Sequence, residues 1–256
     1  MAGILLTAEG LDLSKYANGM VFPHMDTCSY MNIFTRGVDL TRNLAPGKKR
    51  ATIIGSPTFN DGYVRFNNQN CLQTDVDHTN EYAMVVVARA PDPAAESMVV
   101  SNYGSPRTDG LGTGTTNGLS FMYRASTSGF ANMIQFYRRA GDTSDKQGGP
   151  SLSNAEGQRG SFIMHLMSTR GVPGSSGQYI GLWDATGGMR NNNAPMNDTT
   201  FARGSKLRVG GAYAFGANTG SDIAFVGIWN RSMNDADLVA VRDFARTVVG
   251  FNGITV

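Results

Sequence analysis

The feature that most constrains this chain is its succession of short apolar segments that alternate with period two. Clusters of Gly, Ser, Thr, Asn and Asp separate these segments. Successive side chains of an extended strand point to opposite faces, so this alternation predicts sheets with one face packed on a core. The 256 residues include 32 glycines and only four glutamates, a bias that favours turns and strands over helices.

The strongest strand signal is Tyr82–Ala88, a nearly continuous apolar run with β-branched residues at its centre. Its length and the prolines that follow predict a central strand buried on both faces. Upstream, Asn60-Asp61-Gly62 separates Ile53–Phe59 from Tyr63–Phe66, which predicts a hairpin. Further strands are expected at Ser97–Asn102, Gly118–Tyr123, Met133–Arg138, Ser161–Ser168, Gln178–Trp183, Lys206–Val209 and Ile223–Trp229.

A single helix is expected near the end of the chain. Ser232 begins a capping-box-like sequence that runs to Asp235, and Gly250 supplies a stop signal. Between them, apolar residues recur at helical spacing: Leu238, Val241, Ala245 and Val248. Many strands followed by one short helix predict an all-β fold.

Charge and targeting signals narrow the class of protein further. The net charge is +2, and Lys48-Lys49-Arg50 is the only basic run, so nucleic acid is not the expected partner. No segment approaches the length of a membrane span, and the first residues lack the basic region of a signal peptide. Cys28 and Cys71 fall in no metal or redox motif. We expect synthesis in the cytoplasm with both thiols reduced.

The C-terminal third resembles a known family. Leu207–Gly211 followed by Ile223–Leu238 is similar to the closing strands and short helix of laminin G/concanavalin A-like lectin domains. Val64–Asn67 and Gln178–Trp183 match the family more faintly, and the usual Asp-Gly turn after the latter segment is absent. The resemblance implies a two-sheet antiparallel jelly-roll sandwich over residues 50–256, with one short C-terminal helix. Residues 1–49 match nothing in the family and are expected to form an N-terminal assembly arm.

A further resemblance concerns the setting of the domain. Asn43–Gly47 followed by Ala51–Phe66 is similar to the opening of lectin-like domains in tailed-bacteriophage virion accessory proteins. This implies a non-enzymatic virion protein of the tail fibre, baseplate or tail, which assembles with itself and other virion proteins or binds host glycans. One alternative is a capsid decoration protein that staples capsomers. The other is a polysaccharide-degrading enzyme.

The enzyme alternative requires two carboxylates on either side of a glycosidic bond. None of the four glutamates lies in the family's hydrolase motif, and Asp75 and Asp77 form the one Asp-x-Asp pair that a strand would place on one face. A solvated strand end is the simpler interpretation of that pair. His165 lies inside an apolar strand and is expected to be a half-buried sheet residue.

The long polar loops and the aromatic residue beside them are the predicted binding elements, because binding residues concentrate on loops that a rigid scaffold positions. The candidate ligand-binding residues are Asp109, Asn117, Trp183, Asp184 and Asn191. Trp183 could stack on a sugar ring, although core packing is the alternative. No catalytic residue, metal or cofactor is expected; calcium held by loop aspartates is the alternative considered.

Overall fold

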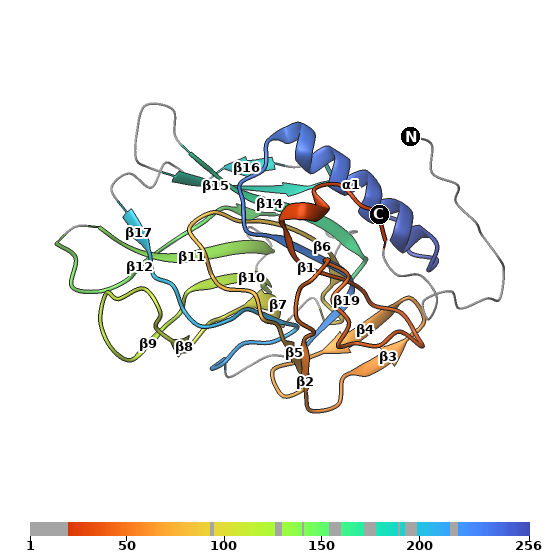
Figure 1. Cartoon of the computed structure of the whole chain (residues 1–256), viewed down its shortest axis with the longest axis horizontal. Coiled ribbons are helices and arrows are strands. Elements are labelled where there is room, and N and C mark those ends of the chain that lie inside the picture. The colour runs from red at the N-terminus through yellow and green to blue at the C-terminus, as the bar shows by residue number, and fades with distance from the viewer. Residues whose placement is uncertain are drawn as a thin grey trace.

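Two antiparallel sheets and one helix make up the protein in this computed structural model (Figure 1). The structure describes residues 20–92, 95–125, 130–139, 141–153, 160–171, 178–188, 190–192, 199–215 and 220–256. The all-β class and the sandwich with a C-terminal helix are therefore confirmed.

The first sheet, called sheet A, has eight strands. In spatial order they are β16 (Arg190–Asn192), β15 (Gln178–Asp184), β14 (Ile163–Gly171), β6 (Ala83–Arg89), β19 (Ser221–Trp229), β4 (Tyr63–Phe66) and β3 (Thr58–Asn60), with β1 (Cys28–Ile33) paired to β19. Every side chain of β6 except the last is buried, which confirms the predicted central strand. The β3–β4 pair is the predicted hairpin, but only Thr58–Asn60 of its first arm belongs to it.

The second sheet, sheet B, has nine strands. In spatial order they are β12 (Lys146–Gly148), β11 (Ala131–Arg139), β10 (Leu119–Tyr123), β7 (Ser97–Ser101), β18 (Arg208–Val209), β5 (Cys71–Gln73) and β2 (Thr52–Ile54), with β13 (Ser151–Leu152) and β17 (Thr199–Phe201) paired to β11. β8 (Ser105–Pro106) and β9 (Thr115–Thr116) form a separate ribbon. β2 pairs with β5, so the first part of the expected hairpin arm belongs to sheet B instead.

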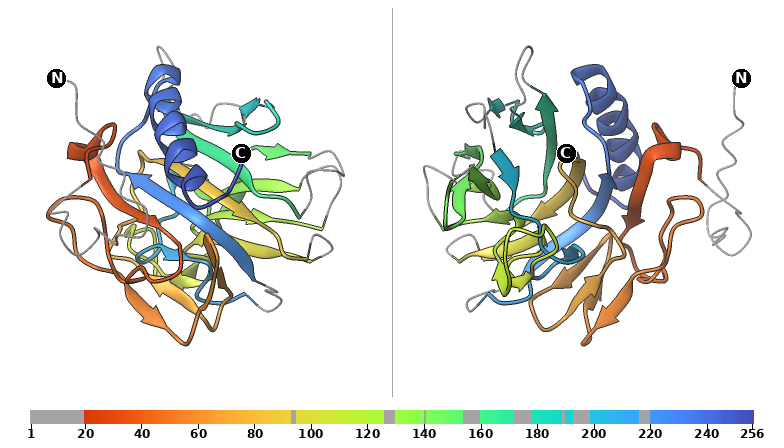
Figure 2. Two further views of the ribbon diagram at one scale, coloured as in Figure 1. Left: turned by 90° about the vertical axis from the view of Figure 1, so that its right-hand side faces the viewer. Right: turned by 60° about the vertical axis from the view of Figure 1, so that its left-hand side comes forward.

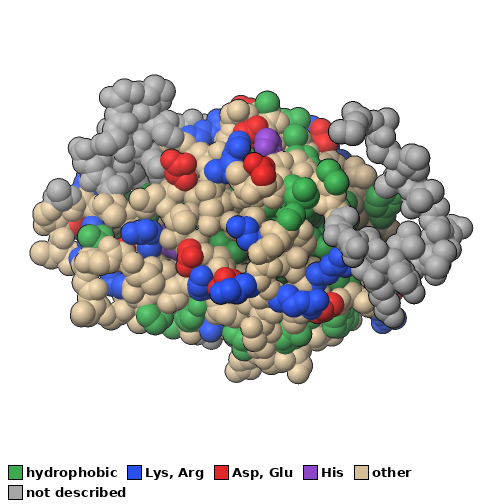
Figure 3. Space-filling view, in the orientation of Figure 1, with side chains coloured by type: hydrophobic (Ala, Val, Ile, Leu, Met, Phe, Trp, Pro, Cys, Tyr) green, Lys and Arg blue, Asp and Glu red, His purple; other side chains and the backbone are tan. Residues whose placement is uncertain are grey.

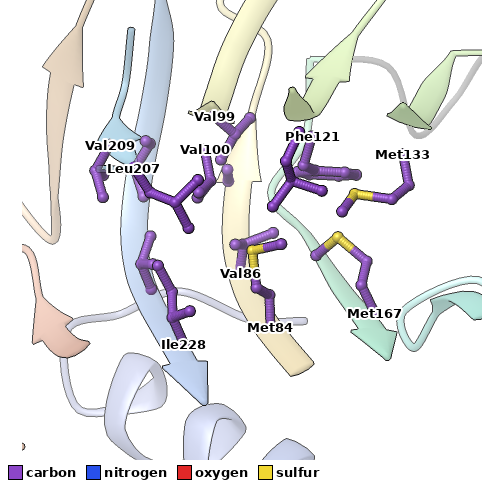
Figure 4. Close-up of a cluster of buried hydrophobic side chains, with 14 of the residues drawn as sticks. Met84, Val86, Val99, Val100, Phe121, Met133, Met167, Leu207, Val209 and Ile228 are labelled. Carbon is purple, nitrogen blue, oxygen red and sulfur yellow. The ribbon is translucent and has the colours of Figure 1, made fainter. Parts of the chain in front are cut away.

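The main core lies between the two sheets (Figure 4). Met84, Val86 and Ile228 of sheet A face Val100 and Phe121 of sheet B, and all five are buried. These residues alternate with side chains of the other face along their strands, as the period-two pattern predicted. A core of this extent needs no disulfide, and both cysteines are free and buried.

A second core covers the other face of sheet A. Helix α1 (Asp235–Gly250) packs there, and Figure 2 shows it lying along one side of the sandwich. Trp229 belongs to this layer, with no exposed surface, and its Nε1 donates to the carbonyl oxygen of His24 at 3.1 Å. A Cβ on Gly227 would come within 2.6 Å of the Trp229 ring, so the glycine makes room for it. Trp229 therefore packs on the helix side of sheet A and not between the two sheets.

The start of the helix also differs from the prediction. Asn234 is the N-cap, because its Oδ1 accepts from the amide of Asp237 at 2.9 Å. The Oγ of Ser232 instead lies 3.0 Å from that of Thr169 on β14. A tertiary hydrogen bond thus engages Ser232, and the cap moves two residues along the chain. The four apolar residues predicted for the buried helix face are all buried.

The segment before residue 50 contributes to the sandwich through β1 and the short 3-10 turn η2 (Met25–Thr27) that precedes it. The N-terminal boundary and the assembly arm remain predictions, and residues 1–19 lie outside the described part of the chain. On the face shown in Figure 3, acidic and basic side chains are interspersed among polar ones. None of the helices in the described ranges is long and apolar enough to cross a membrane.

Candidate functional site

An open groove lies where one sheet passes to the other, beside the turn that joins β4 to β5. Asn67 and Asn70 form an isolated bridge, with reciprocal backbone hydrogen bonds of 3.0 Å. The Oδ1 of Asn67 also accepts from the amides of Gln69 and Asn70, each at 3.0 Å. An asparagine side chain that satisfies backbone donors two and three residues on is typical of tight turns. The turn therefore holds Asn68 and Gln69 at its tip.

The opposite wall of the groove is the segment 212–215, and its path depends on Gly210. This glycine has a φ of +79°, and a Cβ there would lie 2.1 Å from the Cβ of Phe66. Its amide donates to the carbonyl of Val99 at 2.7 Å. Only glycine fits such a left-handed position pressed against another side chain. The chain then turns back over the outer face of sheet B, where Ala212 and Phe215 pack with Met98.

Asn68 joins the two walls. Its Oδ1 accepts from the amide of Ala212 at 2.8 Å, and its Nδ2 donates to the carbonyl of Phe215. One side chain thus holds both ends of the segment 212–215 against the turn, across more than 140 positions of sequence. We regard Asn68 as a positioning residue rather than a binding group, because its hydrogen-bonding atoms are already engaged.

Arg208 on β18 forms part of the same surface. Its Nε donates to Oε1 of Gln73 at 3.0 Å and its Nη1 to the carbonyl of Ala212 at 2.9 Å. The guanidinium carbon lies 3.8 Å from the centroid of the Tyr213 ring. The Tyr213 hydroxyl in turn donates toward Gln73 Oε1 at 2.8 Å, or toward the Lys206 carbonyl at 2.9 Å. Stacking and hydrogen bonds therefore fix the orientation of the guanidinium.

The groove as a whole has a volume of about 790 Å³, within the usual range for ligand pockets. Its described lining is Asn67, Asn68, Gln69, Arg208, Ala212, Tyr213, Ala214 and Phe215. These residues combine amides, a cation and aromatic rings, and the described lining has no carboxylate. Such a surface can bind a polar ligand through hydrogen bonds and ring contacts, but it offers no pair of acidic groups for acid–base chemistry.

The five residues predicted to bind a ligand lie elsewhere, in two separate places. The side chain of Asp109 is fully buried, and its Oδ2 accepts from Arg107 Nη2 at 2.7 Å and from the amide of Arg203 at 2.9 Å. Asn117 is half-buried beside β9. Contacts within the chain thus engage the Asp109 carboxylate, and neither residue lines the groove.

The other three predicted residues lie on β15 and β16. The Arg190 guanidinium covers the half-buried Trp183 ring at 4.0 Å from its centroid, and Arg242 lies 5.4 Å from it. Asp184 is fully buried, and its Oδ1 accepts from the backbone amides of the turn that follows at 2.9 and 2.7 Å. Asn191 is exposed, and its Nδ2 donates to the Ser151 carbonyl. The cavity beside Trp183 holds only about 90 Å³, below the usual range for ligand pockets.

Asp75 and Asp77 lie in the loop after β5 rather than on a strand, and both carboxylates reach the amine of Lys206, at 3.2 and 3.0 Å. The hydrogen bond from Lys206 lowers the pKa of Asp75. A glycosidase needs one carboxylic acid that stays protonated near neutral pH, and so has a raised pKa. Asp75 is shifted in the opposite direction.

Burial rather than exposure characterises two of the histidines. His165 has no exposed surface, which is more than the half-buried position expected. His78 is also buried, and its Nε2 lies 3.0 Å from Oε1 of Gln135. Across the described ranges, no three His, Cys, Asp or Glu side chains gather closely enough to hold a metal ion.

The sequence analysis did not predict the groove, although one of its segments has a recognisable composition. Asn67-Asn68-Gln69-Asn70 is a run of four amide residues between two strands. Such a run is consistent with a solvent-facing loop that offers hydrogen bonds. The second half of the site, around Tyr213 and Phe215, carries no motif by which it could have been paired with the first.

No family model matches the chain. No curated protein matches it either. Solved structures share its fold. The chain is similar to the botulinum neurotoxin type G receptor-binding domain (12% identity, TM-score 0.54, covering 87% of this chain and 51% of that one). It is also similar to the botulinum neurotoxin serotype D binding domain (10% identity, TM-score 0.56, covering 87% and 52%).

A third similar structure is domain 4 of AbnA, a GH43 extracellular arabinanase from Geobacillus stearothermophilus, solved in complex with arabinotriose. It shares 10% identity at a TM-score of 0.55, over 84% of this chain and 98% of that domain. The chain spans about half the length of the neurotoxin domains it matches. At these identities, all between 10% and 12%, the likeness shows a common fold.

Proposed function

We propose that this chain is a non-enzymatic, lectin-like module that binds a glycan in the groove between the Asn67–Asn70 turn and the segment 212–215. The observation that carries the proposal is an open groove of about 790 Å³ in which amide and aromatic side chains converge. Sugars present hydroxyl groups on their edges and C–H groups on their faces. Amides bind the former and aromatic rings pack on the latter.

Gln69 is the side chain that we assign to direct sugar contact. It is exposed at the tip of the turn, and no described residue hydrogen-bonds its side-chain amide. Phe215 is half-buried, 5.6 Å from Tyr103 between ring centroids, and supplies an apolar wall. A flexible amide beside a fixed ring gives adaptable hydrogen bonding at one position and a rigid contact at the other.

A binding role is favoured over hydrolysis by the composition of the groove. Retaining and inverting glycosidases both need two carboxyl groups around the scissile bond. The described lining of the groove contains none, and the Asp75–Asp77 pair lies outside it with a lysine between the carboxylates. The similarity to domain 4 of the arabinanase, whose structure contains arabinotriose, is consistent with this choice.

For the setting, we propose a tailed-bacteriophage particle, in which the module would engage host glycans or anchor neighbouring virion proteins and copies of itself. Support for this comes from the resemblance of Asn43–Gly47 and Ala51–Phe66 to phage lectin-like domains. Electron microscopy of particles labelled with an antibody against the purified protein tests this placement separately from glycan binding. Labelling of tail, capsid or neither discriminates a tail protein, a decoration protein and a protein outside the virion.

The glycan proposal is tested by binding of the purified protein to a glycan array, followed by titration calorimetry with the best saccharide. We expect Gln69→Ala to weaken binding by about 3- to 10-fold, the loss that one net hydrogen bond predicts. Gln147→Ala is the matched control, because Gln147 is also exposed but lies on β12, at the opposite edge of sheet B. Absence of saccharide binding by the unmodified protein, or equal losses in both variants, would overturn the assignment.

A further inference from the structure

The Arg208 guanidinium in the groove has no carboxylate partner among the residues that the structure describes. Its only described hydrogen-bond acceptors are the neutral Gln73 Oε1 and Ala212 carbonyl, and it forms no ion pair with any residue that the structure describes. The Nη2 group of Arg208 donates to no described residue. Its N–H groups at the end of the planar guanidinium are therefore available to a ligand.

Three other arginines of this protein are paired with carboxylates, whereas Arg246 donates to the backbone carbonyls of Val256 and Ala185. Arg65 and Arg89 both bind the buried carboxylate of Asp222, at 2.7 and 2.8 Å. Arg107 lies 2.7 Å from Asp109 and 2.7 Å from Asp145. Arg65, Arg89 and Arg107 thus have carboxylate partners, whereas Arg208 has none among the described residues.

The uncompensated cation is also held in place before any ligand arrives. Stacking on Tyr213 at 3.8 Å and two hydrogen bonds fix the plane of the group, and Asn68 fixes the segment that provides one of the acceptors. Ordering a side chain on binding costs conformational entropy. Because the folded protein already orders Arg208, a ligand would lose less free energy in this way. A fixed guanidinium with free donors is suited to planar recognition of a carboxylate.

From these observations we infer that the groove selects an acidic saccharide, whose carboxylate pairs with Arg208 while neighbouring hydroxyl groups meet the amides of the turn. The inference rests on the proposed glycan-binding function and specifies its ligand class as uronic-acid-containing chains. With a full positive charge and no described acidic residue in its lining, the groove would favour such a chain over a neutral one of the same backbone.

The test compares ligands that differ only in the carboxyl group. Polygalacturonate, hyaluronan and alginate fragments are titrated against the purified protein, each beside a derivative whose carboxylates have been reduced to primary alcohols. We expect about 10- to 100-fold weaker binding of the reduced form of the preferred fragment, the range for one charge-assisted contact. Binding of the acidic form should weaken as salt rises, whereas that of the reduced form should not.

Protein variants provide the second arm. Arg208→Gln should lose the preference for the acidic form, and Arg208→Lys should retain only part of it, because an ammonium keeps the charge but lacks the planar donors. Arg242→Gln, on the helix side of sheet A, removes the same charge at a distance and should leave the preference unchanged. The ligand comparison requires no variant, so it stays decisive if Arg208→Gln fails to fold.

The outcomes separate the two proposals. Equal affinity for acidic and reduced fragments would refute the acidic ligand class, while a loss of that binding in Gln69→Ala would leave the groove as a neutral-glycan site. An acid preference that survives Arg208→Gln would also refute the role of this residue. If the array and all fragments give no binding to the unmodified protein, both the glycan-binding function and the ligand class fail.

Discussion

Acid should destabilise this protein through a histidine buried between the two sheets. His165 has no exposed surface, and its ring lies 5.1 Å from that of Phe121 and 5.7 Å from that of Tyr123, between centroids. The Tyr123 hydroxyl lies 3.4 Å from its Nδ1, and no described residue pairs with its Nε2. Burial without a charged partner lowers the pKa of His165 from 6.5 to about 3.

The size of the effect follows from proton linkage. Below pH 6.5 the unfolded chain takes up a proton at this histidine, whereas the folded chain excludes it until about pH 3. The folded state therefore loses stability as pH falls through this window. At pH 4.5, two units below the unfolded value, the loss is about 3 kcal/mol. His78, whose pKa burial lowers to about 4, acts in the same direction.

Substitution of His165 by Phe isolates this contribution. Urea denaturation at pH 7.5 and 4.5, followed by tryptophan fluorescence, gives the free energy of unfolding of each variant. The difference between the two pH values should be smaller in His165→Phe than in the unmodified protein by about 2–3 kcal/mol. Any packing cost of the larger ring appears at both pH values and cancels in the difference.

Two further features bear on this experiment. Burial raises the pKa of Asp184, directly opposite His165 on β15, so acidification relieves a penalty there and opposes the histidine effect. The comparison of variants is therefore needed, because the total pH dependence of stability contains the opposing contributions of His165 and Asp184. Met167→Leu, on the same strand and face, is the control and should keep the full dependence. An identical acid sensitivity in His165→Phe and the unmodified protein would refute the reasoning.

Two further predictions concern stability and can be checked by urea denaturation at neutral pH. Asp222→Asn should cost about 2–3 kcal/mol, less than a fully buried pair because its two arginine partners are partly exposed, whereas Asp77→Asn, with a 71% exposed side chain, should cost at most about 0.5 kcal/mol. Gly210→Ala should destabilise the fold and abolish saccharide binding, because its Cβ would clash with Phe66. Gly47→Ala has a similar positive φ but open space around it, so it should cost only about 1 kcal/mol, and equal losses would contradict the clash.

The fold could be predicted from the sequence because its determinants are local and repeated. A nearly continuous apolar run marks β6, short apolar segments mark β10, β14 and β19, and the helical spacing of Leu238 to Val248 marks α1. Each signal needs only a few adjacent residues, and one error at a boundary leaves the layer arrangement unchanged. The helix cap shows the limit of such signals. Ser232 and Asn234 are both residue types that can cap a helix. Ser232 forms a hydrogen bond with Thr169 on β14 instead, and Asn234 is the cap.

The candidate site could not be predicted in the same way, since exposure and partners are properties of the folded chain. Trp183 is of a residue type that can stack on a sugar, yet the guanidinium groups of Arg190 on β16 and Arg242 on α1 lie over its ring. Asp184 lies one residue further on, but the alternation of the strand turns it into the core.

The same dependence on tertiary partners explains why the groove could not be predicted from the sequence. Gln69 and Arg208 are unremarkable in sequence, an amide in a turn and a cation after a leucine. What distinguishes Arg208 is that the fold provides it with neutral acceptors and an aromatic ring but, among the described residues, no carboxylate. A charge left without a partner in a surface with room for a ligand makes selectivity for an opposite charge the natural physical hypothesis. How strongly the groove prefers an acidic ligand depends on the position of this guanidinium, which Asn68 and Gly210 help to fix through the segment 212–215.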